Sequence, residues 1–470
     1  MSRLTYVSTR GAAPVLGFAD VLLAGLARDG GLYVPSEWPA LAPGDLQRFA
    51  AMPYADVATE VMWPFVDGGI DRGAFAALVA DAYATFDAPD VVPLTDLGDD
   101  LWLAELFHGP TLAFKDVALQ LVGRLFDHEL SRRGERVTVV GATSGDTGSA
   151  AIEALRDRDA VDVFILHPAG RVSEVQRRQM TTVLSPNIHN VAVEGTFDDC
   201  QDLVKALFAD EAFRDRRRLS AVNSINWARV MAQIVYYVTA SRSLGATAEA
   251  PVTFSVPTGN FGNVLSGWIA REMGAPIKDF IVASNANDIL TRFINDNDMS
   301  TRAVQPTVSP SMDIQVSSNF ERLLFEINGR DGGMTAEQLQ RFRHTGSLHV
   351  EGDQVARWIT PSFRAARFDD DGTLAEIRRV HEASGQLIDP HTATGTAAVR
   401  ALDATADGRP VVTLATAHPA KFPDAVVRAT GIHPPLPLHL ADIFERTERT
   451  NRVANDLGAV QAFVESAVAR

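Results

Sequence analysis

The sequence predicts an α/β protein whose parallel-type sheets are flanked by helices, preceded by a mostly helical N-terminal region. Three observations carry this prediction. From about residue 100, short apolar runs alternate with helix-length segments, which is the pattern of parallel sheets covered by helices. Two glycine-rich loops each follow a predicted strand and open a helix. Residues 1–95 instead repeat apolar side chains at helical spacing.

The alternation divides the chain into three predicted units. Residues 1–95 form an N-terminal helical domain, residues 134–225 form a small α/β domain, and residues 96–133 together with 226–470 form a larger α/β domain. The small domain is therefore inserted into the larger one. In folds of this kind the active site lies at the carboxyl ends of the strands, so we expect it in the cleft between the two α/β units.

Several local signals refine this division. Asp71 and Ser173 are expected to cap helices, and residues 227–243 are expected to form one. Residues 296–350 show less regular periodicity, with a glycine-rich loop near 329–333. The last 25 residues have the pattern of a helical tail.

Composition excludes several classes of protein. The 470 residues carry a net charge of −16 with no basic stripe, which disfavours binding to nucleic acid or to an anionic membrane. The sequence has no apolar run of membrane-spanning length and no recognisable signal peptide. A single cysteine, Cys200, precludes an internal disulfide and fits a reducing compartment. We therefore expect a cytoplasmic location and neither nucleic acid nor membrane as a partner. A monomer or a homodimer is expected, although composition does not decide between them.

Residues 107–116 carry a lysine in unusual surroundings. A Gly-Pro turn leads into a short loop with Lys115, and a helix is expected over residues 117–133. Lys115 lies between Phe114 and the apolar residues of that helix. Apolar surroundings lower the pKa of a lysine, so that its neutral amine can act as a base or as a Schiff-base nucleophile. On this stretch alone, a lysine that extends its charge to water remains the alternative.

Two glycine-rich loops supply anion-binding features. Residues 141–149 and residues 257–263 each run from a predicted strand into a helix, whose N-terminus and backbone N–H groups suit a phosphate or carboxylate. The first loop matches neither a Walker A loop nor a dinucleotide fingerprint. Each loop could instead be a plain strand-to-helix connection.

The lysine and the two loops together indicate a cofactor with an aldehyde and a phosphate, and an anionic substrate. Pyridoxal 5'-phosphate (PLP) meets this description, because a lysine can hold it as a Schiff base while one loop binds its phosphate and the other the substrate. Thr416, at the end of a predicted strand, could offer a hydroxyl to the pyridine nitrogen. The spacing of His, Cys and carboxylate residues indicates no metal site.

The chain resembles the threonine synthase family, in its longer bacterial and fungal type, within the tryptophan-synthase-β-like class of PLP enzymes. The resemblance runs nearly end to end and implies PLP fold type II. It is carried by the stretches at residues 6–11, 29–35, 108–116, 143–148, 224–229, 259–263 and 416–422.

The resemblance also implies roles for individual residues. Lys115 would be the catalytic lysine that holds PLP, and Arg229 would bind the substrate phosphate. Asp146 stands where many relatives have an Asn near the 3'-oxygen of the cofactor, so the protonation state of that contact is left open. The other implied cofactor-binding residues are Gly259, Asn260, Phe261, Asn263 and Thr416, and the other implied substrate-binding residues are Thr143, Ser144, Thr147, Asn223 and Ser224.

The implied reaction is that of a lyase in threonine biosynthesis, which converts O-phospho-L-homoserine and water to L-threonine and phosphate. It proceeds by γ-elimination of phosphate followed by addition of water at Cβ. Two alternatives remain on the sequence alone. One is another fold type II enzyme, such as a serine or threonine dehydratase. The other is a non-catalytic, synthase-like protein that binds metabolites, although the intact Lys115 and both loops argue against it.

Overall fold

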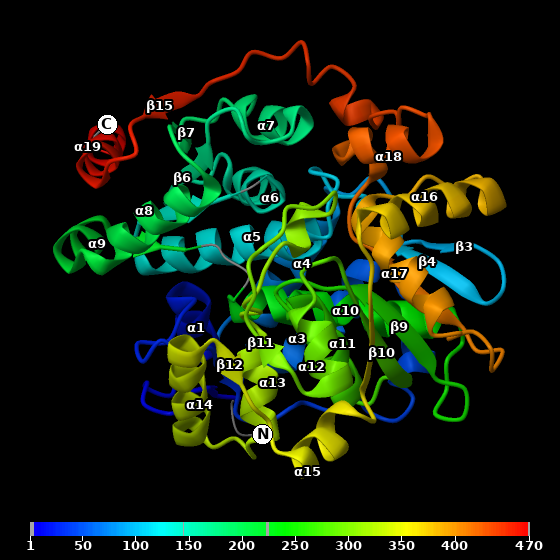
Figure 1. Cartoon of the computed structure of the whole chain (residues 1–470). Helices are drawn as coiled ribbons and strands as arrows, with labels where there is room; N and C mark the ends of the chain where they lie inside the picture. Colours follow the sequence, from blue (N-terminus) through cyan, green and yellow to red (C-terminus); the bar gives the residue numbers. More distant parts are fainter. Residues whose placement is uncertain (1–3, 144, 222–224, 469–470) are drawn as a thin grey trace.

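A six-stranded and a five-stranded sheet organise the chain, and helices cover both faces of each (Figure 1). This computed structural model describes residues 4–143, 145–221 and 225–468. The predicted α/β architecture with parallel-type sheets is confirmed.

The larger sheet carries the chain around Lys115. Neighbouring strands in its centre run parallel, and only the edge pair β3–β4 is antiparallel. The strand order is β13 (Phe363–Arg367), β10 (Ile277–Ser284), β9 (Val252–Pro257), β14 (Val411–Ala415), β4 (Leu101–Glu105) and β3 (Leu94–Asp96).

Alternating side chains of these strands bury both faces of the larger sheet. In β14, Val412 and Leu414 join the main core, whereas Val411 and Ala415 pack in two clusters on the opposite face. The helices of the main core include α5 (Lys115–Arg133), α10 (Trp227–Ser243) and α11 (Gly262–Glu272), and those of the opposite face include α16 (Asp370–Ser384), α17 (Pro390–Ala401) and α18 (Pro423–Thr430).

The smaller sheet is parallel throughout, and its strand β5 runs into the 141–149 loop. Its order is β15 (Asn451–Val453), β7 (Ile188–Val193), β6 (Val161–Pro168), β5 (Val137–Ala142) and β8 (Leu219–Ser220). Its helices are α6 (Asp146–Leu155) and α7 (Glu174–Thr181) on the face toward the main core, and α8 (Phe197–Ala209), α9 (Glu211–Arg217) and α19 (Leu457–Val468) on the other.

The C-terminal segment crosses from the larger unit to the smaller one. After α18 the chain runs past the short η4 (Leu438–Leu440) to β15, which pairs with β7 (Figure 1). The helix α19 then buries Val460 and Val464 in the cluster that also contains Cys200. The prediction of a purely helical tail is therefore wrong in part, because a strand precedes the helix.

The N-terminal region is mainly helical, as predicted, but it also contains a strand pair. The antiparallel strands β1 (Tyr6–Ser8) and β2 (Tyr33–Pro35) bring the first motif beside residues 29–35. Asp71 caps its helix through a bond from the Ala74 N–H, as expected. The helices are α1 (Phe18–Ala24), α2 (Asp45–Phe49), α3 (Tyr54–Val66) and α4 (Arg72–Tyr83).

The irregularity predicted for residues 296–350 is found over residues 301–309, but the wider segment 285–362 also contains helices and a short strand pair. Of the predicted glycine loop, Gly329 does lie in a turn, whereas Gly332 and Gly333 begin a helix that Asp331 caps by accepting from the Met334 N–H. The elements here are α12 (Ile289–Asp296), β11 (Met299–Ser300), η1 (Pro310–Met312), α13 (Phe320–Ile327), α14 (Gly332–Thr345), β12 (Ser347–Leu348), α15 (Gly352–Gln354) and η2 (Val355–Ile359).

Candidate active site

Lys115 is the first residue of α5, which corrects the prediction that it lies in a loop before a helix at residue 117. Its side chain is buried, with 8% of the residue exposed. The preceding residues are fastened to the chain that follows β14: the Phe114 N–H donates to the Thr416 carbonyl at 2.9 Å, and the His418 N–H donates to the Leu112 carbonyl at 3.0 Å. Lys115 therefore sits at the carboxyl end of the larger sheet.

The turn before Lys115 closes around Asp116. Its carboxylate accepts from the Thr111 N–H at 2.8 Å and from the Thr111 hydroxyl at 2.7 Å. Gly109 packs so closely that a Cβ there would lie 2.4 Å from the Asp116 Cβ. Burial raises the pKa of Asp116 to about 6. The two bonds from Thr111 stabilise the charged form and so lower this pKa, but burial outweighs them. The turn thus has a fixed geometry that no larger residue than glycine can share.

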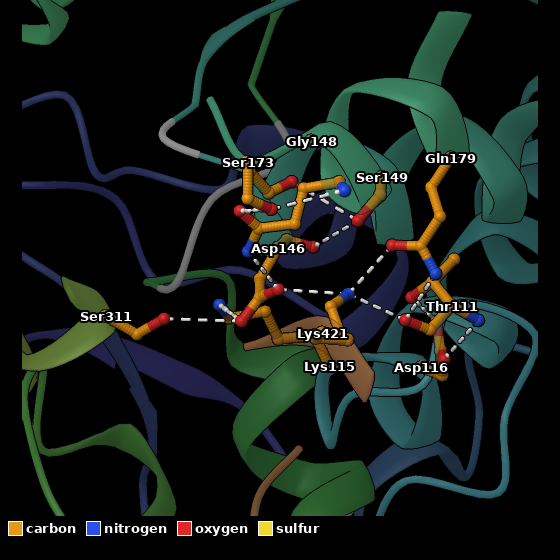
Figure 2. A network of polar contacts seen from close by, with 12 residues as sticks. Thr111, Lys115, Asp116, Asp146, Gly148, Ser149, Ser173, Gln179, Ser311 and Lys421 are labelled. Atoms are coloured by element: carbon orange, nitrogen blue, oxygen red, sulfur yellow. Dashed lines mark hydrogen bonds and ion pairs between the residues drawn. The ribbon is translucent and has the colours of Figure 1, made fainter. Parts of the chain in front are cut away.

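Asp146 of the smaller unit faces Lys115 of the larger one (Figure 2). It is the first residue of α6, after the loop that follows β5. Its Oδ2 lies 3.4 Å from the Lys115 Nζ and 3.3 Å from the Ser311 hydroxyl. Its Oδ1 lies 2.9 Å from the Lys421 Nζ and accepts from the Gln176 amide at 2.8 Å. One carboxylate therefore lies between two lysine side chains.

These charges set the protonation of the site. Burial lowers the pKa of Lys115, and the cationic Lys421 and Arg229 lower it further, although Asp146 opposes them. Burial alone would raise the pKa of Asp146, but Lys421 and Lys115 outweigh it and hold that pKa well below its usual value. The site therefore pairs an ionised carboxylate with an amine that loses its proton more readily than a surface lysine.

The hydroxyls of the 141–149 loop do not all face outward. The Thr143 hydroxyl accepts from the N–H groups of Gly145 and Gly148, at 2.9 and 2.8 Å, so it shapes the turn into α6. Thr147 follows Asp146 in the first turn of α6 and is partly buried. Ser144 lies outside the described residues.

The 257–263 loop follows β9 and opens α11. Gly259 passes so near to the chain at η1 that a Cβ would lie 2.9 Å from the Ser311 carbonyl oxygen. Phe261 has a φ of 61°, a left-handed conformation that costs a non-glycine residue energy, and its buried ring packs 5.6 Å from Phe320. Asn260 is exposed at the tip of the loop.

Asn263, in the first turn of α11, has a side-chain donor available for a ligand. It is 7% exposed, and its amide oxygen accepts from the hydroxyls of Tyr236 and Tyr237, at 2.5 and 2.9 Å. Its Nδ2 has no hydrogen-bond partner among the described residues. A buried amide donor at a helix N-terminus is the kind of group that a phosphate satisfies.

Arg229 is a second unsatisfied donor. It lies in the first turn of α10 with 4% of its surface exposed, and burial lowers its pKa to about 10. In the part of the chain that the structure describes, its Nε and Nη1 have no hydrogen-bond partner and no carboxylate pairs with it. The predicted alternative, an ordinary salt bridge on a helix, is not seen there. Asn223 and Ser224, predicted to act with Arg229, lie outside the described residues.

Thr416 follows β14 and lies beside the Lys115 segment, as its backbone bond to Phe114 requires. Its residue is 6% exposed. His418, two residues on, turns toward Phe107 and His108, and burial lowers its pKa to about 4. His108 bridges two carboxylates, with Nδ1 2.8 Å from Asp87 and Nε2 2.8 Å from Glu105. These histidines therefore support the segment and do not face Lys115.

Sequence reasoning missed the residues that surround Asp146. Lys421 lies within the family stretch at 416–422, but nothing in its local pattern distinguishes it from a surface lysine. Ser173 caps α7 as predicted, but the sequence does not indicate that the Gln176 side-chain amide reaches Asp146. Gln179 and Ser311 carried no signal in the sequence.

The residues present fit PLP. A buried lysine with a lowered pKa, an unsatisfied buried amide at a helix N-terminus and a close glycine contact beside it are what an aldehyde and a phosphate require. Among the described residues, no cluster of His, Cys, Asp or Glu is placed to hold a metal ion. In the same residues no helix is both long and apolar enough to cross a membrane.

Three family models match the chain in succession. "Threonine synthase N terminus" matches residues 5–83, "Pyridoxal-phosphate dependent enzyme" matches residues 90–417, and "Threonine synthase, C-terminal" matches residues 392–464. Together they span nearly the whole sequence, including both glycine-rich loops and Lys115.

Individual relatives agree over their full length. A threonine synthase of Pseudomonas aeruginosa is 55% identical over 464 residues, which cover 98% of each chain. The crystal structure of PLP-bound threonine synthase from Brucella melitensis superposes with a TM-score of 0.96 at 50% identity, covering 99% of each chain. Yeast threonine synthase superposes with a TM-score of 0.94 at 37% identity, covering 100% of this chain and 99% of the yeast chain.

Proposed function

The chain belongs to the threonine synthase family, and on that premise we propose that the site around Lys115 converts O-phospho-L-homoserine and water to L-threonine and phosphate. The protein is a PLP-dependent lyase. The observation that carries the proposal is the buried Lys115, with its lowered pKa, facing the ionised Asp146 at the carboxyl ends of both sheets.

Lys115 would hold PLP covalently, and the start of α11 would hold its phosphate. The N–H groups of residues 259–263 and the free Nδ2 of Asn263 supply donors there without a basic side chain. Phe261 would keep the loop in its left-handed turn through its packing on Phe320. Thr416 would face the pyridine nitrogen with a hydroxyl, and Asp146 would lie near the 3'-oxygen.

When bound, PLP withdraws electrons from the substrate and so stabilises negative charge on the carbon next to the amino group. The proton movements belong to Lys115. Its Nζ takes the proton from Cα of the substrate, because its lowered pKa leaves the amine free to accept one, and it carries protons between Cα, Cβ and Cγ. Asp146 remains ionised and faces the Lys115 Nζ across a contact of 3.4 Å.

Arg229 would bind the phosphate of the substrate. Its planar guanidinium can donate to two phosphate oxygens at once, and its Nε and Nη1 have no partner among the described residues. Thr147 would add a hydroxyl, and Thr143 would shape the loop around the substrate. Ser144, Asn223 and Ser224 stay in the proposal on the family pattern alone.

The reaction balances with these groups alone. One Cβ–H bond and the Cγ–O bond break, and phosphate leaves with the electron pair of the C–O bond. Cγ gains a proton in exchange for the one lost from Cβ, and the oxygen of water bonds to Cβ while its released proton balances the charge of the leaving phosphate. Two anionic groups, one on the cofactor and one on the substrate, explain why the site holds two separate sets of anion donors.

Three further proposals accompany the activity. The chain divides into units at residues 1–95, 134–225, and 96–133 with 226–470, although β15 of the last stretch pairs with the smaller sheet. The protein acts as a monomer or homodimer, and it acts without nucleic acid, which its net charge of −16 supports. A cytoplasmic location is supported by the single cysteine, Cys200, which precludes an internal disulfide and fits a reducing compartment.

The direct test supplies the purified, PLP-loaded protein with O-phospho-L-homoserine and measures threonine and phosphate. We expect the two products in equal amounts, and none from Lys115→Ala, which also loses the visible absorbance of the bound cofactor. Turnover of serine or threonine without threonine formation would favour a dehydratase. Absence of a cofactor absorbance band from the wild-type protein would favour a non-catalytic binder.

A further inference from the structure

Lys421 is buried in the middle of the site although neither the sequence motifs nor the proposed reaction gives it a role. It lies at the end of η3 (Pro419–Lys421) with 0% of its surface exposed. Its Nζ contacts three acceptors: the Asp146 Oδ1 at 2.9 Å, the Thr111 carbonyl at 2.7 Å and the Gln179 Oε1 at 3.0 Å (Figure 2). A lysine ammonium has three donors, so all of them are used.

We propose that Lys421 is a positioning residue, which binds one oxygen of Asp146 so that the other oxygen, as a carboxylate, faces Lys115. This proposal rests on the proposed function in one respect, namely that Lys115 holds the cofactor.

The two oxygens of Asp146 have different partners. Oδ1 receives Lys421 and the Gln176 amide, at 2.9 and 2.8 Å, whereas Oδ2 receives Lys115 and the Ser311 hydroxyl, at 3.4 and 3.3 Å. The shorter contacts are all on Oδ1. Lys421 and Gln176 therefore fix the carboxylate, and the looser Oδ2 contact leaves Lys115 free to move during the reaction.

Lys421 also joins the two α/β units at this point. Asp146 and Gln179 belong to α6 and α7 of the smaller unit, whereas Thr111 belongs to the turn before Lys115 in the larger one. The Gln179 amide donates to the same Thr111 carbonyl at 3.0 Å. One buried ammonium thus sets both the charge around Asp146 and its distance from the turn that carries Lys115.

The composition of the chain indicates that a lysine is specifically required here. Of 43 basic residues only four are lysines, namely Lys115, Lys205, Lys278 and Lys421. Two of these four are buried against the same carboxylate, and the other two are exposed and paired with Asp202 and Asp407. The three donors of an ammonium radiate from a single nitrogen, so one compact atom reaches all three acceptors, whereas the donors of a guanidinium are spread over a larger plane.

Removal of Lys421 and removal of Asp146 should shift the pKa of the Lys115 nitrogen in opposite directions. The charged groups that face Lys115 are Asp146, Lys421 and Arg229; His391 also acts on Asp146, and Asp116 on Lys421. Without the positive charge of Lys421, Asp146 favours the protonated nitrogen of Lys115 more strongly. Without the negative charge of Asp146, that nitrogen loses its proton more readily.

The test follows the visible absorbance of the PLP-loaded protein against pH, which reports protonation of the nitrogen contributed by Lys115. We expect Lys421→Met to raise the apparent pKa and Asp146→Asn to lower it, each by about one to two units. The double variant should return close to the wild-type value. Lys278→Met, which removes a surface lysine from its pair with Asp407, should change nothing.

The outcomes separate this inference from the proposed function. Equal pKa values in wild type and Lys421→Met, or shifts in the same direction for both single variants, would overturn the role of Lys421 while leaving the activity intact. If Lys421→Met does not fold, Asp146→Asn and the double variant decide, because the inference requires the double variant to titrate higher than Asp146→Asn. A wild-type protein without the absorbance band would instead count against the proposed function and, with it, this inference.

Discussion

Replacement of Arg322 by methionine should loosen three parts of the chain at once. Arg322 is 1% exposed in α13, where its Nε donates to the Tyr33 carbonyl at 3.0 Å and its Nη2 to the Ile225 carbonyl at 2.6 Å. Its Nη1 donates to the amide oxygen of Asn319. The Asn319 N–H and side-chain amide in turn donate to the Asn260 carbonyl, at 3.0 and 3.1 Å. The N-terminal region, residue 225 and the proposed phosphate loop thus share one guanidinium.

The cost follows from these three bonds. Each buried bond that loses its donor costs about 1–3 kcal/mol, and the removal of a buried positive charge offsets part of the sum over three bonds, so we expect about 4 kcal/mol in total. For a chain of 470 residues, an unfolding entropy of about 2 cal/mol/K per residue gives about 1 kcal/mol per degree. Arg322→Met should therefore lower Tm by about 4 °C. Arg322→Lys, which keeps a charge and one donor, should lower Tm by about half as much.

Hydrogen exchange with peptide resolution is the decisive assay. We expect faster exchange around residues 33, 225 and 319, and weaker retention of PLP, with no change in α8 of the smaller sheet. The matched control is Arg341→Met, which removes an arginine that is 64% exposed and paired with Glu337. If Arg322→Met behaved like this control in both Tm and exchange, the reasoning would be refuted.

Three further predictions concern the turn before Lys115. Gly109→Ala should destabilise by about 1–3 kcal/mol and displace Lys115, since its Cβ would lie 2.4 Å from the Asp116 Cβ, whereas Gly17→Ala has nothing within 4 Å and should be neutral in thermal unfolding. The pKa of Asp116 is raised from 3.8 to about 6, so the folded protein holds this proton more tightly than the unfolded chain. The free energy of unfolding should therefore fall by up to about 3 kcal/mol as pH rises from about 4 to 7. Denaturant titrations of Asp116→Asn should lack this dependence on pH. The pKa of His108 is raised by Glu105 and Asp87 despite its burial, so its contribution is complete below pH 6.5 and lost as pH rises through the folded pKa; His108→Gln should remove this dependence from Tm measured against pH.

The sequence could predict the sheets and the two loops because their signals are local. Apolar runs and glycine positions lie within a few residues of one another, and helix 227–243 and the Asp71 cap were predicted at the residues where they occur. The start of α5 was misplaced by two residues, because the Gly-Pro turn suggested a longer loop than the Asp116 carboxylate allows.

The supports of the site could not be predicted, because their partners are distant in the chain. Lys421 binds a carbonyl 310 residues away, and Arg322 binds one 289 residues away. The N-terminal motifs are another example. Thr9 and Arg10 bind Glu321 at 2.6 and 2.9 Å, so residues 6–11 fasten the N-terminal region to the segment beside Asn319. Periodicity and local motif carry no information about such pairs.

The distribution of charge explains why the site favours anions in an acidic protein. The whole chain carries a net charge of −16, yet around Lys115 two lysines and Arg229 face one ionised carboxylate, Asp146. The Asp116 carboxylate is instead bound by the Thr111 N–H and hydroxyl. An excess of buried cations over buried anions lowers the stability of the fold, and an anionic ligand removes that cost when it binds. The same excess of positive charge lowers the pKa of Lys115. It therefore both attracts a phosphate ester and leaves the Lys115 amine free to accept the proton from Cα of the substrate.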